Sequence, residues 1–237
     1  MGALVSAARA RRARGEASLA RSSLSSVDPS ASADALAAAA RDYEACSADA
    51  RRAWSSLSPA AAQAADAGRS SEAFRLVPAA GAEAIYLDAV CASAWSRTQG
   101  FTQLVERRGE IQEALRRAAE LSPALDDAGP ERELGRLLAS LPAYAGGDLR
   151  EARLHLETAI ARAPLAPRNH LLYAKAVAVK LQDRTLFEAQ LNAALEPKPL
   201  TPEDRAAVAE SRDLLQREDE LFGPAQAAQP TPGGPAR

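Results

Sequence analysis

One spacing of small and apolar residues occurs three times between positions 111 and 199. In each copy three such residues stand at successive offsets of four and three, and a proline follows five positions later. Offsets of four and three return to one face of an α-helix, and a proline ring cannot join the helical hydrogen-bond ladder. Each copy therefore predicts a helix with a buried seam that ends near its proline. The copies are Ile111, Leu115, Ala118 and Pro123; Ala152, Leu156, Ala159 and Pro164; and Phe187, Leu191, Ala194 and Pro199.

A partner helix is expected before each copy, because the segments 81–100, 129–142 and 167–183 carry apolar residues at helical spacing. In the middle segment Gly135 stands where two helices would pack closely. A helix pair cannot bury its apolar face alone, so repeated pairs stack on one another. We expect three antiparallel pairs between residues 81 and 199, stacked with a common handedness.

The rest of the chain is also expected to be mainly helical. Ala39, Tyr43 and Cys46 repeat the offsets of four and three, which indicates a degenerate fourth pair near the N-terminus. Thr201 before Pro202 is a typical helix start. The expected parts are N-terminal helices at 1–58, a connector with one short helix at 59–80, three repeats at 81–199, a capping helix at 200–222 and a Pro/Gly tail that cannot order itself at 223–237.

The composition supports this all-α prediction and argues against several partners. Aromatic residues make up 4% of the 237 residues, and the abundant alanine, leucine, arginine and glutamate are strong helix formers. A formal net charge of −2 gives no global attraction to nucleic acid or to an anionic membrane. No stretch approaches the ~20 apolar residues of a transmembrane segment, and the first residues show no secretory signal.

Residues that could carry chemistry are better explained structurally. Cys46 and Cys91 have neither disulfide-scaffold nor metal-ligand spacing, so we predict small buried side chains and leave their pairing open. The two histidines are expected on helix surfaces, with no zinc pattern around them. We predict core roles for the two tryptophans, a turn with an N-cap at Gly146–Asp148, and solvated roles for the acidic pairs at 126–127 and 218–219. We therefore predict no catalytic residue, no cofactor and no metal.

Two resemblances narrow the fold and the function. Leu134, Gly135 and Leu138, followed by the seam at 152–164, resemble the tetratricopeptide repeat, with about five residues added between the helices. The stretch from 80 to 196 resembles the T component of tripartite ATP-independent periplasmic (TRAP) transporters. That resemblance rests on Gly129–Pro130, Leu141–Pro142, Gly146–Leu149, Gln182–Arg184 and Leu186–Phe187.

The resemblances imply a fold, a location and partners. The fold is an all-α, tetratricopeptide-like stack of antiparallel helix pairs, an α-α superhelix with a C-terminal capping helix. The transporter resemblance implies a periplasmic lipoprotein that associates with a solute-binding protein and forms a homotrimer. No lipobox cysteine is visible near the start of the sequence, so either the start is truncated or the location is cytoplasmic.

In tetratricopeptide stacks, fixed positions of each first helix line the concave wall. In the helical register set by Leu134 and Ala174, six residues face that wall. The wall would present basic side chains around an apolar base. The six residues are Arg132, Arg136, Asn169, Leu172, Ala176 and Lys180. These residues would bind a carboxylate-bearing ligand or an acidic partner.

The leading hypothesis is a non-catalytic accessory component of a TRAP-type solute transporter. The alternative is a cytoplasmic tetratricopeptide-type adaptor that assembles other proteins. A third class, a small enzyme, lacks a readable catalytic constellation.

Overall fold

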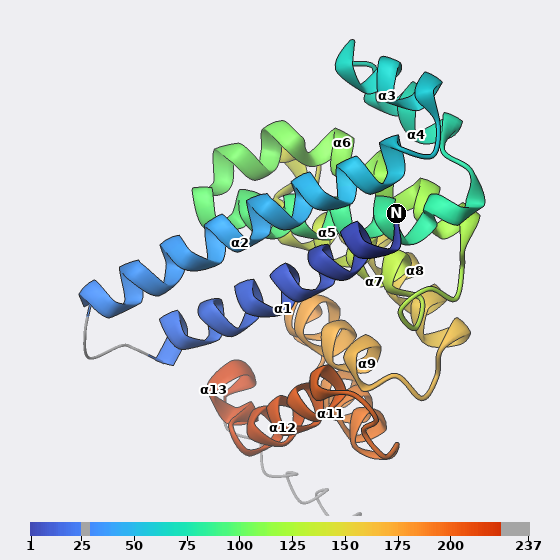
Figure 1. Cartoon of the computed structure of the whole chain (residues 1–237). Helices are drawn as coiled ribbons and strands as arrows, with labels where there is room; N and C mark the ends of the chain where they lie inside the picture. The colour runs from blue at the N-terminus through green and yellow to red at the C-terminus, as the bar shows by residue number, and fades with distance from the viewer. Residues whose placement is uncertain (25–28, 224–237) are drawn as a thin grey trace, which may run out of the picture. The chain divides into compact units, whose positions relative to one another are not determined.

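The structure is a computed structural model that describes residues 1–24 and 29–223. Throughout these two ranges the regular structure is helical, with no strand, which confirms the all-α prediction (Figure 1). The chain divides into two compact units, Met1–Pro164 and Leu165–Arg237, which are described separately below.

The first unit is built from helices that pack in chain order. Figure 1 shows α1 and α2 side by side as an antiparallel pair, and the packing continues from α2 to α5, α6, α7 and α8. The expected connector holds two short helices, α3 and α4, rather than one. The elements are α1 (Gly2–Leu24), α2 (Pro29–Ser55), α3 (Pro59–Asp66), α4 (Ser70–Leu76), η1 (Ala79–Gly81), α5 (Ala82–Gln99), α6 (Phe101–Leu121), α7 (Gly129–Ser140), η2 (Ala143–Ala145) and α8 (Leu149–Arg162).

The predicted seams are buried. All nine seam residues of α6, α8 and α11 are at most 1% exposed, and each of these helices ends before the proline of its motif. A Cβ atom at Gly135 would meet Leu156 Cγ at 2.5 Å, so a side chain there would separate α7 from α8. The periodicity therefore predicted both the helices and their buried faces; a superhelix of common handedness remains a prediction.

The prediction that the two cysteines are buried is confirmed, and the structure resolves their pairing, which the sequence left open. Cys46 on α2 and Cys91 on α5 form a disulfide, with their Cα atoms 5.9 Å apart. The reason is that α2 packs against α5, which brings together two residues separated by 45 positions in sequence. Spacing within single helices cannot show which helices become neighbours.

The second unit is a smaller helical assembly. Phe187 and Leu191 lie at the centre of its core, and α12 packs on both α9 and α11. Thr201 and Asp204 form a capping box at the start of α12, as expected of a helix start at Thr201. The elements are α9 (Pro167–Tyr173), η3 (Ala174–Ala178), α10 (Val179–Leu181), α11 (Arg184–Leu195), α12 (Pro202–Gln216) and α13 (Glu218–Phe222).

Two details of this unit differ from the sequence expectation. The first helix of the third pair contains a five-residue π-helix, η3, and the expected capping helix is interrupted at Arg217. The predicted Pro/Gly tail lies, beyond Gly223, outside the described residues.

Among residues 1–24 and 29–223, no single helix has the length and hydropathy of a membrane span. One pair bent by 118°, Ser70–Leu76 with Ala79–Gln99, meets the length and composition criterion together.

Candidate functional site

Arg132, predicted as an exposed wall residue, is instead buried at 2% exposure. Its guanidinium donates to Asp126 Oδ2 at 2.8 Å and approaches the Tyr86 hydroxyl at 3.4 Å. The Tyr86 hydroxyl donates to the same Asp126 oxygen at 2.6 Å. Arg132 is therefore a member of a buried polar network, and the expectation that Asp126 is a solvated carboxylate is also wrong.

The reason for this burial is an unusual turn before α7. Asp126, Asp127 and Ala128 all have positive φ angles, of 50°, 55° and 59°. Non-glycine residues adopt this left-handed conformation at a cost, so three in succession need support from their surroundings. Arg132 supplies it by donating to the Asp126 carbonyl at 3.1 Å and approaching the Asp127 carbonyl at 3.4 Å. These contacts of Arg132 thus stabilise the backbone turn that leads into α7.

Arg136 lies in a different environment, on the partly exposed side of α7. Its Nε is 3.0 Å from Glu133 Oε2, and α7 contacts α5, which carries the exposed Arg97. Burial opposes ionisation of Glu133, but Arg136, Arg132, Arg97 and Arg12 outweigh it and hold its pKa below the usual range. Glu133 therefore stays charged among several cations.

Arg97 is a residue that sequence reasoning missed. It donates to Ser93 Oγ at 2.7 Å, and no carboxylate of the described residues is within ion-pair distance. Although much of the Arg97 residue is exposed, the protein atoms packed around its guanidinium, followed by the positive charge of Arg136, lower its pKa. We call Arg97 and Arg136, with Glu133 close by, the arginine pair. No sequence signal marks Arg97, because its role depends on α5 lying beside α7.

The other four predicted wall residues belong to the second unit. Asn169 and Leu172 are buried, Ala176 is partly buried and Lys180 is exposed. Ala176 lies within the π-helix η3. The binding role of these four residues remains a prediction.

The histidines have specific partners rather than free surface positions. His155 Nδ1 lies 2.7 Å from Glu131 Oε2, and His170 Nδ1 lies 2.8 Å from Gln190 Oε1. The expectation of a solvated helix-surface histidine is therefore wrong for His170, which is 7% exposed, whereas His155 stays partly exposed on α8. Within the part of the chain that the structure describes, no group of three His, Cys, Asp or Glu side chains could hold a metal ion.

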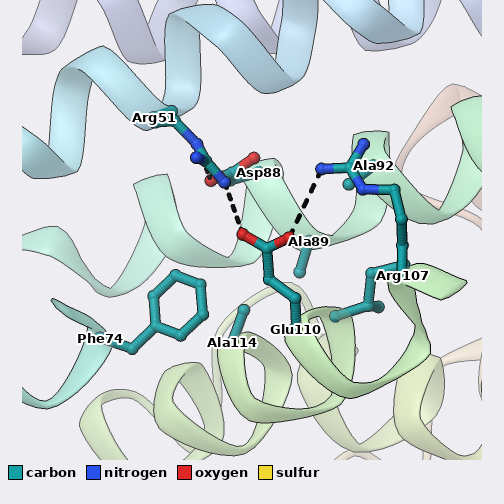
Figure 2. Close-up of a pocket in the computed structure, with 9 residues that line it drawn as sticks. Arg51, Phe74, Asp88, Ala89, Ala92, Arg107, Glu110 and Ala114 are labelled. Atoms are coloured by element: carbon teal, nitrogen blue, oxygen red, sulfur yellow. Dashed lines mark hydrogen bonds and ion pairs between the residues drawn. The ribbon is translucent and has the colours of Figure 1, made fainter. Parts of the chain in front are cut away.

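A small pocket of the first unit contains a second charge cluster (Figure 2). Glu110 of α6 accepts from Arg51 Nη2 at 2.6 Å and lies 3.7 Å from Arg107, as the dashed lines in Figure 2 show. The cavity volume is about 10 Å³, which is room for about one water molecule. Arg51 also lies 3.7 Å from Asp88, so the cluster connects α2, α5 and α6.

The buried carboxylate of this cluster is satisfied by protein donors. Trp54 Nε1 donates to Asp88 Oδ2 at 2.9 Å, and Ser47 Oγ donates to Oδ1 at 2.5 Å. Burial raises the pKa of Asp88, although Arg51 and these hydrogen bonds partly counter the rise. Trp54 is 1% exposed, which confirms its predicted core role. Since the cavity is small and Asp88 accepts from several donors, the cluster serves packing, and the arginine pair is the better candidate for binding.

Comparison with known proteins supports the resemblance stated above. A family model described as TRAP transporter T-component matches residues 25–222, most of the chain. A search of curated proteins finds no match.

Proposed function

The chain belongs to the TRAP transporter T-component family, and from this premise we propose that it is a non-catalytic component that binds an acidic segment of the transporter's solute-binding subunit. Members of this family are accessory components of transporters and are generally not enzymes. The choice of partner and of surface is the proposal.

The observation that carries this proposal is the arginine pair. Arg97 and Arg136 stand on neighbouring helices, and Glu133 neutralises only part of their charge. A guanidinium presents several N–H donors in a planar fork that matches a carboxylate, so a carboxylate of the partner could accept from both side chains. Positive charge gathered at one place also attracts an acidic partner although the whole chain is slightly acidic.

Within the second unit we propose a separate contact with the partner at the two predicted wall residues that are not buried, Ala176 and Lys180, while Asn169 and Leu172 lie in its interior. Lys180 is exposed and would add a further positive charge, and Ala176 would add small apolar area. Association with other subunits follows from membership of a transporter family; a homotrimer is part of the proposal.

We propose an envelope location, either in the periplasm or anchored as a lipoprotein. The Cys46–Cys91 disulfide supports it, because structural disulfides form and persist in oxidising compartments. The same disulfide and the family match do not favour a cytoplasmic adaptor.

The test is titration of the purified chain with the purified solute-binding subunit of the same transporter, followed by calorimetry. The double variant Arg97→Gln/Arg136→Gln should bind at least about 10-fold more weakly, because it loses charge-assisted hydrogen bonds. Arg41→Gln, an exposed arginine of α2, is the matched control and should bind like wild type. Wild-type affinity should also fall as salt concentration rises.

Two results would contradict the proposal. One is wild-type affinity in the double variant while its melting temperature is unchanged. The other is the absence of binding between the wild-type chain and the solute-binding subunit.

A further inference from the structure

Helix α1 (Gly2–Leu24) is attached to the first unit through charged side chains as well as apolar ones. It lies beside α2 and also contacts α5, and it contributes Val5 and Ala8 to the buried core (Figure 1). The family model matches from residue 25 onwards, so the match assigns no role to α1. Four arginines of α1 form ion pairs: Arg9 with Glu83, Arg11 with Asp49, Arg12 with Glu16 and Arg14 with Asp42.

Arg12 is the arginine of this group that reaches into the interior. Its side chain is 17% exposed, whereas the other three are at least 38% exposed. Arg12 Nε donates to Glu16 Oε1 at 2.8 Å, and Arg12 Nη1 lies 3.8 Å from Asp126 Oδ2. Its guanidinium carbon also lies 5.9 Å from the centre of the Tyr86 ring. Arg12 therefore joins α1 to the turn that precedes α7.

From Asp126 the ion pairs continue to the arginine pair. Asp126 Oδ2 accepts from Arg132 Nη2 at 2.8 Å, and Arg132 Nε lies 3.8 Å from Glu133 Oε1. The other carboxylate oxygen of Glu133 lies 3.0 Å from Arg136 Nε. Anions and cations thus alternate over six side chains, which we call the ion-pair series: Glu16, Arg12, Asp126, Arg132, Glu133 and Arg136.

The inner part of this series is shielded from water. Arg132 is 2% exposed and Glu133 is 7% exposed, and charge interactions are stronger in such surroundings than in water. Arg12 is also one of four arginines whose charges outweigh the burial of Glu133 and hold the pKa of its carboxyl below the usual range. A change of charge at Arg12 therefore alters the electrostatic environment of Glu133.

The alternation of sign fixes the direction of this effect. With Arg12 present, Asp126 is shared between two cations, so Arg132 retains charge for Glu133, and Glu133 neutralises less of Arg136. Without Arg12, Asp126 draws on Arg132 alone, and Glu133 neutralises Arg136 more completely. Loss of the Glu16 carboxylate has the opposite effect, because Arg12 then offers more of its charge to Asp126.

We propose that Arg12 is a positioning residue for the arginine pair, and that α1 thereby sets the affinity of Arg97 and Arg136 for the acidic segment of the solute-binding subunit. Arg12 acts through the ion-pair series and does not touch the partner. This inference rests on the proposed function, since it concerns the same site, and it adds a helix that regulates that site.

The test is the same titration of the full chain with the purified solute-binding subunit. Arg12→Gln and Glu16→Gln break the same ion pair, but they change the charge beside Asp126 in opposite senses. Arg12→Gln should weaken binding by about 3-fold or more, and Glu16→Gln should tighten it by about 2-fold or more, effects within the range of couplings along such networks. Arg12→Lys keeps the charge and should stay within about 2-fold of wild type. A purely structural role of the ion pair would instead weaken binding in both glutamine variants.

The matched control is the ion pair between Arg9 of α1 and Glu83 of α5. Glu83 lies about 21 Å from Arg97 along α5 at the rise of an α-helix, so Arg9→Gln and Glu83→Gln should each leave affinity unchanged. A double-mutant cycle measures the coupling directly: Arg12→Gln should have a smaller effect in the Arg136→Gln background than in wild type.

Melting temperatures show whether each variant is folded. Glu16 is 41% exposed, so Glu16→Gln should lower the melting temperature by less than about 4 °C. Glu16→Gln therefore tests the inference even if Arg12→Gln fails to fold.

The inference is overturned if Glu16→Gln binds no more tightly than wild type, or if a folded Arg12→Gln chain binds as tightly as wild type does. Loss of binding in Arg97→Gln/Arg136→Gln with unchanged affinity in both α1 variants would remove this inference and leave the proposed function standing. Absence of binding by the wild-type chain would overturn both.

Discussion

At the scale of single residues, the arginines of this chain have different roles according to whether they are buried or exposed. Arg132 stabilises a strained turn from a position that is 2% exposed, whereas Arg136, one turn further along α7, remains partly exposed. Arg132 and Arg136 are four residues apart and lie on the same face of α7. The difference in their burial therefore comes from the turn at Asp126–Ala128 and from Tyr86. A residue type and a register are therefore insufficient to assign a binding role.

Replacement of Arg132 by methionine should strongly destabilise the first unit. The substitution leaves Asp126 without its closest cation and removes donors from two carbonyls of the left-handed turn. Breaking a buried pair from one side costs about 3 kcal/mol. Denaturant unfolding monitored by circular dichroism measures this loss. Arg69→Met is the control, because its pair with Glu72 is exposed and should contribute less than about 1 kcal/mol; equal losses in the two variants would refute the structural role of Arg132.

At the scale of helices, specific polar contacts join α7 to α8 in addition to the apolar seam. Glu131 on α7 accepts from Arg162 Nη1 at 2.8 Å and lies 2.7 Å from His155 Nδ1, both on α8. One turn further along the same face of α7, Gly135 lets Leu156 of α8 approach closely. The pair is thus fixed by apolar packing along its length and by a charge cluster at one place.

The Glu131 cluster predicts a specific pH dependence of stability. The hydrogen bond from His155, followed by the charges of His155 and Arg162, lowers the pKa of Glu131 despite its partial burial. A carboxylate whose folded pKa is depressed stabilises the fold above its unfolded pKa of about 4.3, and this contribution is lost as pH falls through the folded pKa.

Glu131→Gln should therefore lower the free energy of unfolding by about 1–2 kcal/mol at pH 7, and the difference from wild type should shrink below about pH 4. Urea unfolding of both proteins between pH 3 and pH 7 measures it. Glu120→Gln is the control, since Glu120 is 65% exposed in its pair with Arg117. A difference that stays constant over this range would exclude the ionised carboxylate as its source.

At the scale of the whole molecule, the sequence predicted the features that depend on a single helix, such as its buried face and its end. The seam of Ala152, Leu156 and Ala159 was predictable because burial follows a helical period and proline marks the end. The Cys46–Cys91 disulfide was not, because it depends on which helices pack together. The same limit applies to the arginine pair: Arg136 could be proposed from its register, but Arg97 could not.

The division into two units leads to the last prediction, that a fragment of residues 1–164 folds without the rest of the chain. The largest core cluster, which runs from Val5 to Leu141 and includes Trp54, lies wholly within this range, and so does the disulfide. The cluster around Phe187 and Leu191 lies wholly within the second unit. Because the two cores share no residue, removing the second unit leaves the first core complete, and a chain of this size can bury enough apolar surface to be stable.

The fragment should therefore be helical and should unfold in one cooperative denaturant transition, measured by circular dichroism. A fragment ending at Leu121 lacks α8 and also α7, which contributes Leu134 and Leu137 to the core, so it should be several kcal/mol less stable. A non-cooperative transition for residues 1–164 would show that the first unit depends on the second. Equal stability of the two fragments would show that α7 and α8 do not stabilise the first unit. Cooperative unfolding would instead allow the arginine pair to be tested for binding in the first unit alone.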